Sequence, residues 1–199
     1  DAAMMGYESH SESDYDPVFK HTGDTVSLPK RRATSPAYRQ AKQELEELFK
    51  KKTEREAFQE FVDTIHANEK IPGRPGPYDD KEQDFVQMQN RKAVIERYET
   101  QDAEPNFTFT LHTVRVGDCA ISTNPFELYL HYGQIIKARS HAFQTFLVQL
   151  CPGGGGYLPS PEAERLGGYG GMIVNGNCGS DGGYKLADTA VAKINELFD

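Results

Sequence analysis

Hydrophobic side chains recur at helical spacing in three stretches of the first half of the chain. The first stretch opens at Ser35-Pro36, where Ser35 is the expected N-cap and Pro36 the first helical residue. The pattern predicts helices over residues 35–49, 54–67 and 81–99. Their apolar positions are Tyr38, Ala41, Leu45, Leu48 and Phe49, then Phe58, Phe61, Val62 and Ile65, then Phe85, Met88, Val94, Ile95 and Tyr98.

Two other segments of this half have no sustained period. Residues 1–34 are rich in Ser, Asp, His and Tyr and are predicted to form an irregular arm that needs the rest of the protein to be ordered. Residues 71–80 contain three prolines and two glycines and are predicted to be a connector. Position 1 is not Met, which suggests that the chain starts inside a longer one.

From Asn106 onward apolar and polar residues alternate, which is typical of a half-buried strand. A shorter apolar run at 119–123 predicts a more central strand. A helix over 125–138 and a strand over 144–150 follow, and together with 119–123 they make a βαβ unit. A last helix is predicted over 183–198.

The loops after two parallel strands leave from the same edge of a sheet, where open α/β sheets usually bind ligands. The sequence "NPFE" (124–127) and the sequence "CPGGGGYLPS" (151–160) are therefore expected on one side of the sheet. The predicted fold class is α/β: a helical N-terminal part, then a mixed sheet with a βαβ unit and a long glycine-rich loop. Residues 35–199 are expected to form a single domain.

Charge and composition narrow the range of partners. The net charge is −8 and the sequence pI is about 5.3, which disfavours electrostatic capture of nucleic acid or of an anionic membrane. No apolar stretch approaches the ~20 residues of a membrane span. Three cysteines without a CxxC pair argue against a zinc knuckle and leave the redox compartment open.

The glycine-rich segment 153–183 has the most unusual composition in the chain. It contains neither GxxxxGK[ST] nor a complete GxGxxG, so a nucleotide site is disfavoured. A flexible surface loop and a lid or binding loop are the two interpretations, because loops of this length in compact domains are usually functional. Tyr157 and Tyr169 lie in this segment, and their phenols are candidate ligand contacts.

Glu127 has two interpretations as well. An acidic residue in the first turn of the predicted helix would complement the helix dipole, for about 0.3–1 kcal/mol. Alternatively, Glu127 and His131 share a helix face at a spacing of four and form half of a metal site, although no HExxH is present. His112 and His141 are expected to be surface or capping residues. No GxSxG motif marks a nucleophilic serine.

The segment "RVGDCAISTNPFELYLHYGQIIKARSHAFQTFLVQLCPGGGGYLPSPEAERLGGYGG" resembles the second half of the catalytic domain of the neutral, non-lysosomal ceramidase family, particularly its bacterial ceramidase-like members. The pattern G-D-x-A-I…P-x-E is followed about thirty residues later by G-Y-x-x-[ST]-x-E. The resemblance extends over residues 110–199, and "LPKRRATSPAYRQAKQELEEL" is similar to the lead-in of the same region.

This resemblance implies a zinc-dependent amidohydrolase that cleaves the N-acyl amide of ceramide or a related lipid amide. It assigns zinc ligation to Glu127 and Tyr157 and a substrate or oxyanion contact to Tyr169. The substrate-binding positions that it implies are Asn124, Gly156 and Ser160. A carboxylate and a phenolate with two imidazoles would leave a position for water, whose pKa zinc lowers toward neutrality.

The resemblance also implies a partner. The two zinc histidines of the family belong to the first half of the domain, and none of the six histidines of this chain lies in the family's histidine motifs. The expected partner is therefore the N-terminal half of the same protein, and the chain alone is expected to be inactive. "NPFE" stands where the family usually has P-G-E, which leaves the acyl substrate open. Family members in bacteria are commonly exported, so a secreted or periplasmic location is expected.

Two alternatives stay open. One is a non-catalytic relative that binds a polar ligand or partner through the glycine-rich segment. The other is an autonomous metal site built from Glu127, His131 and another histidine. Zinc binding by the 199-residue chain alone would reveal the second alternative.

Overall fold

The computed structural model describes residues 2–10, 13–73 and 83–199. The chain divides into two compact units: residues 1–27, 108–154 and 184–199 form the first, and residues 28–107 and 155–183 form the second. Each unit is described by itself, and the single domain expected over 35–199 stays a prediction. Within the described part of the chain, none of the helices combines the length and apolar character that a membrane crossing requires.

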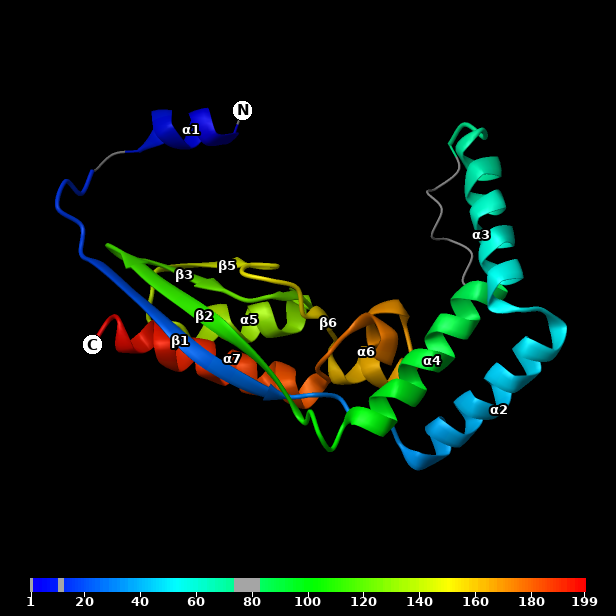
Figure 1. Cartoon of the computed structure of the whole chain (residues 1–199). Coiled ribbons are helices and arrows are strands. Elements are labelled where there is room, and N and C mark those ends of the chain that lie inside the picture. The colour runs from blue at the N-terminus through cyan, green and yellow to red at the C-terminus, as the bar shows by residue number, and fades with distance from the viewer. Residues whose placement is uncertain (1, 11–12, 74–82) are drawn as a thin grey trace. The chain divides into compact units, whose positions relative to one another are not determined.

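The first unit is built on a sheet with the strand order β1-β2-β3-β5 (Figure 1). Strand β3 pairs antiparallel with β2 and parallel with β5, so the sheet is mixed and the predicted α/β class is confirmed. The strands are β1 (Phe19–Pro29), β2 (Asn106–Val116), β3 (Cys119–Thr123) and β5 (Gln144–Val148).

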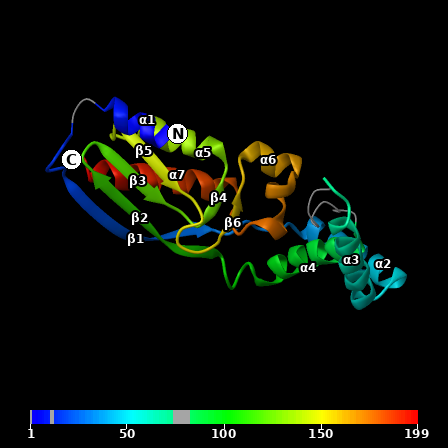
Figure 2. The ribbon, with the colours of Figure 1, turned by 90° about the horizontal axis from the view of Figure 1, so that it is seen from above.

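Helices α5 (Leu130–Arg139) and α7 (Ser180–Glu196) lie side by side along one face of this sheet (Figures 1 and 2). Tyr132 of α5 is fully buried, and its ring meets the ring of Tyr184 of α7 edge to face, with 5.5 Å between the centroids. Arg139 adds an ion pair to Asp188 at 2.6 Å. The parallel β3-α5-β5 unit confirms the predicted βαβ arrangement.

Two predictions for this unit are wrong. The segment expected as an irregular arm contains helix α1 (Ala2–Ser9) and the eleven-residue strand β1. The helix expected over 125–138 begins only at Leu130, because Phe126–Leu128 form a short strand, β4. The buried side chains of β4 alternate with a half-buried one, which is a strand pattern and not a helical one.

The second unit contains the three predicted helices, α2 (Ser35–Lys51), α3 (Glu54–Glu69) and α4 (Asp84–Thr100). The N-cap of α2 is Thr34 and not Ser35, since the Thr34 hydroxyl accepts the Ala37 N–H. Of the predicted third helix, residues 81–82 lie outside the described residues, as does most of the connector at 71–80.

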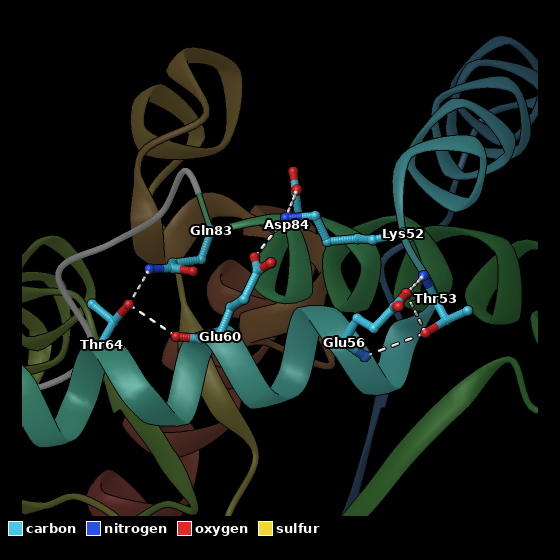
Figure 3. Close-up of polar contacts among 7 residues, drawn as sticks. All are labelled: Lys52, Thr53, Glu56, Glu60, Thr64, Gln83 and Asp84. Atoms are coloured by element: carbon cyan, nitrogen blue, oxygen red, sulfur yellow. Dashed lines mark hydrogen bonds and ion pairs between the residues drawn. The ribbon is translucent and has the colours of Figure 1, made fainter.

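The start of α3 is held by a capping box (Figure 3). The Thr53 hydroxyl accepts the Glu56 N–H, and the Glu56 carboxylate accepts the Thr53 N–H at 2.8 Å. Lys52 bridges the two neighbouring helices through ion pairs to Glu60 at 2.5 Å and to Asp84 at 3.0 Å. These contacts fix the turn between α2 and α3 and the approach of α4.

The glycine-rich segment is not one continuous loop. It contains strand β6 (Gly156–Leu158), helix α6 (Pro161–Leu166) and two short 3-10 helices, η2 (Tyr169–Gly171) and η3 (Ile173–Asn175). Ser160 caps α6, because its hydroxyl accepts the Ala163 N–H at 3.3 Å. The segment therefore presents its tyrosines from short, defined elements.

Candidate functional site

Asn124 forms hydrogen bonds that hold the backbone in place just after β3 in the first unit. The residue is 3% exposed, and its side-chain oxygen accepts the Phe126 N–H at 3.1 Å. Its backbone N–H donates to the carbonyl of Val148, and its own carbonyl accepts the Cys151 N–H, both at 2.9 Å. Asn124 was expected to bind substrate. In the structure its side chain instead stabilises the turn at the ends of the parallel strands.

Glu127 follows on β4, between the buried side chains of Phe126 and Leu128. It is half-buried, and among the described residues its carboxylate has no hydrogen-bond or ion-pair partner. The interpretation as a first-turn helix residue is wrong, since the helix starts three residues later. The oxygens of Glu127 are not among the fully buried side-chain atoms without a partner, so water reaches the carboxylate and it is open to a cation.

The side chain of Gln149 explains why no helix forms at 125. Its Oε1 accepts the Leu128 N–H at 2.8 Å, and its Nε2 donates to the Leu128 carbonyl at 3.4 Å. The amide therefore acts as a strand neighbour for Leu128, while Asn124 takes the N–H of Phe126. The Leu128 carbonyl, which a helix begun at 125 would offer to the N–H of Tyr132, is thus bound to a side chain, and the Tyr132 N–H donates to the carbonyl of Tyr129 instead.

The predicted sharing of a helix face by Glu127 and His131 is wrong for the same reason. His131 lies on α5, where its Nε2 is 3.1 Å from the hydroxyl of Tyr184. In the described ranges, no group of three or more His, Cys, Asp or Glu side chains has the arrangement of a metal site. The ring of His112 is hydrogen-bonded to the ring of His21, and the backbone N–H of His141 donates to the side chain of Asn195. Neither histidine contacts Glu127 in these bonds.

Tyr157 and Tyr169 meet in the second unit. Tyr157 belongs to β6 and Tyr169 to η2, and their rings pack edge to face with 5.7 Å between the centroids and 79° between the planes. Tyr169 is half exposed. The structure therefore brings together the two phenols that the sequence singled out, along with Gly156 and Ser160 of the same segment.

Close backbone contacts hold the tyrosine pair. Gly156 has a φ of +71° and pairs with Gly176 through an isolated β-bridge. A Cβ on Gly156 would overlap the carbonyl oxygen of Asn175, and a Cβ on Gly176 would overlap that of Tyr157. Asn175 in turn donates its Nδ2 to the carbonyl of Tyr169 at 2.7 Å. Glycine is thus required at both positions of the bridge.

Three charged residues that sequence reasoning missed anchor this segment. Glu164 accepts the Ser180 N–H at 2.7 Å and pairs with Nε of Arg31 at 3.0 Å. Arg31 also donates to the carbonyl of Gly171. Arg97 donates to the carbonyls of Arg31, Gly176 and Asn177, and burial lowers the pKa of its guanidinium. No local pattern marks these residues, because their partners lie far away in the sequence.

A hollow of about 220 Å³ lies beside Tyr169 in the second unit. Phe61 from α3, Val86 from α4 and Met172 give it an apolar wall. Its polar lining comes from Gln87, Asn90, Arg91 and Asn175. The lining combines apolar and polar side chains, as small-molecule sites do, but the volume is below the roughly 300–1,000 Å³ of typical ligand pockets.

No protein-family model, no curated protein and no solved structure matches the chain significantly. The chemistry of the site and the sequence motifs are therefore the basis for a functional proposal.

Proposed function

We propose that the chain is the C-terminal half of a zinc-dependent amidohydrolase that resembles neutral ceramidase. Its reaction is hydrolysis of the N-acyl amide of ceramide or of a related lipid amide. The observation that carries the proposal is the half-buried, unpartnered carboxylate of Glu127, in the chain that leaves the parallel strand β3. That end of a parallel sheet is where α/β proteins bind ligands.

Two side chains of this chain are proposed as zinc ligands by their donor type. Glu127 supplies a carboxylate that forms no hydrogen bond or ion pair with a described residue. Tyr157 supplies a phenol from β6. Both are oxygen donors of the kind that zinc accepts, and two histidines of a preceding region would join them, with a position left for water. Zinc bound there would lower the pKa of a water and polarise the amide carbonyl. A secreted or periplasmic location is part of the same proposal.

The remaining candidate residues, three in the second unit and Asn124 in the first, are proposed to position the substrate. Tyr169, whose ring packs against Tyr157, donates a hydrogen bond from its hydroxyl to the amide oxygen as negative charge develops on that oxygen. Gly156 allows close backbone approach, and Ser160 fixes the direction in which the chain continues into α6. Asn124 sets the path of the chain that carries Glu127.

The test uses a protein extended by the region that precedes Asp1 in its gene. Glu127→Gln keeps the size of the side chain but removes the charge, so zinc content, measured by plasma mass spectrometry, is expected to fall at least about tenfold, in line with the loss of a ligand. Hydrolysis of a fluorogenic N-acyl amide falls with it. Glu46→Gln, an exposed position outside the motifs, is the matched control and retains both. Unchanged zinc content in Glu127→Gln contradicts the ligand assignment.

One observation favours a second candidate, a metal-free binding module. The hollow beside Tyr169 has an apolar wall and needs no zinc to take a small ligand. In this case the extended protein contains no zinc and has no amidase activity, while Val86→Trp, which fills the hollow, abolishes ligand binding. Stoichiometric zinc in the extended protein decides for the hydrolase.

A further inference from the structure

The two edge strands of the sheet in the first unit differ in their protection. Strand β1 carries Lys20 and Asp24, and charged residues on an edge discourage pairing with other chains. Strand β5, at the opposite edge, has the sequence Gln-Thr-Phe-Leu-Val and no charge. Among the described residues no strand pairs with its outer side. β5 is thus an open edge without the usual protection.

The uncharged stretch extends beyond β5 on both sides. In the first unit, residues 142–154 contain no Asp, Glu, Lys or Arg, although 26% of the chain is charged. Around the strand, Phe143 is 91% exposed and Leu150 is 55% exposed. Such large apolar side chains beside an open edge mark a surface that another protein covers.

The side chains of β5 alternate between two faces of the sheet. Leu147 points to α5, since a Cβ on Gly133 would lie 3.4 Å from its Cδ1. Phe146 therefore lies on the opposite face, where it is 50% exposed. Its neighbour across the parallel pair is Ile121, which in turn faces Val114. An apolar row thus crosses the sheet and ends at the open edge with Phe146.

We propose that β5 pairs with β5 of a second copy of this chain, antiparallel about a two-fold axis. Phe146 is the middle residue of the strand, so the symmetric register places it beside Phe146 of the partner subunit and continues the apolar row across the interface. The sheet then runs through both copies, and the outward N–H and C=O groups of β5 are satisfied.

The symmetry of the strand argues for a second copy over a foreign peptide. A two-fold axis at Phe146 sets an uncharged, apolar strand against itself, so no acidic residue of either copy, each with a net charge of −8, lies in the strand pairing. A foreign strand would need charges or pockets along the edge to be selected, and β5 has no charges. The inference concerns the 199-residue chain and does not use the zinc site of the proposed function.

Sedimentation velocity on the 199-residue chain tests the proposal. The wild-type chain is expected to form a dimer with a dissociation constant in the micromolar range, as befits a small interface. Phe146→Lys places two like charges opposite each other and raises this constant by about tenfold or more. Val116→Lys is the matched control, because Val116 is 41% exposed on the same sheet face but lies on β2, away from the edge. The Val116→Lys chain is expected to dimerise like the wild type.

A second measurement does not depend on a variant. Hydrogen exchange of the β5 amides is expected to slow as the wild-type concentration rises through the dissociation constant, while exchange in β1 is unchanged. A chain that is monomeric throughout the micromolar range overturns the proposal and leaves the edge to another partner. A dimer that Phe146→Lys leaves intact overturns it as well.

Discussion

Cys178 is the most protected of the three thiols. Its side chain is 1% exposed, and burial raises its pKa to about 12, while the nearby Arg97 and Lys30 act in the opposite direction. Because the thiolate is the nucleophile, a thiol with this pKa is almost entirely unreactive at pH 8. We expect iodoacetamide at pH 8 to alkylate the exposed Cys151 and to leave Cys178 unmodified, as read by peptide mass spectrometry.

The direction of the pH dependence follows from the raised pKa. In the unfolded chain the thiol has its ordinary pKa of about 8.5, so urea at pH 8 exposes Cys178 to alkylation. In the folded protein its modification rises only as the pH approaches the raised value. Between the two values the unfolded state binds fewer protons than the folded state, so this thiol lowers the free energy of unfolding as the pH rises. Equal alkylation of Cys178 and Cys151 in the native protein at pH 8 would contradict this account.

Glu127 shows what the sequence allows at a single residue and what it does not. Its candidacy followed from its place after a central strand, which the structure bears out. Its backbone conformation was wrongly predicted, because the side chain that replaces the helical hydrogen bonding is Gln149, more than twenty positions later. A contact of that separation leaves no periodic signal near Glu127.

Among the elements, those with strong local periodicity were predicted and those that depend on distant partners were not. Helices α2, α3 and α4 repeat apolar residues at helical spacing, although each fully buries only one of its described residues, and β3 is a compact apolar run. Each could therefore be identified from its own residues. In strand β1 only two of the described residues, Val26 and Leu28, are buried. Its formation depends on β2, far along the chain, and its exposed face of His, Gly, Thr and Ser resembles a loop.

The bridge between Gly156 and Gly176 is the element on which the tyrosine pair depends. We expect Gly156→Ala to lower the free energy of unfolding by about 2–4 kcal/mol, because the new Cβ meets the carbonyl of Asn175 and the φ of +71° disfavours alanine. Urea unfolding followed by circular dichroism measures the change. The packing of Tyr157 on Tyr169 should loosen, which near-UV circular dichroism detects.

Gly154→Ala is the control for this substitution. A Cβ at that position meets nothing within 4 Å, and its φ lies outside the left-handed region. Its free energy of unfolding is expected to stay within about 0.5 kcal/mol of wild type, as for other surface substitutions. If both glycine variants were equally stable, the close approach of the two backbone segments would be wrong.

At the scale of the whole molecule, net charge decides how two copies approach each other. Each chain carries −8, and the strand proposed to join them contributes none of that charge. Repulsion between the copies is long-ranged at low salt, where the Debye length is about 30 Å at 0.01 M, and is largely screened at 0.15 M, where it is about 8 Å. Salt should therefore favour the dimer.

We expect the dissociation constant of the dimer, measured by sedimentation velocity, to fall severalfold between about 0.01 and 0.15 M sodium chloride, because screening removes the repulsion and leaves the apolar strand contact intact. An interface made of ion pairs would respond in the opposite way and weaken with salt. A dissociation constant that rises with salt would therefore place the contact on a charged surface and not on β5. Val116→Lys, which keeps the edge and changes the net charge from −8 to −7, should show the same dependence with a slightly smaller slope.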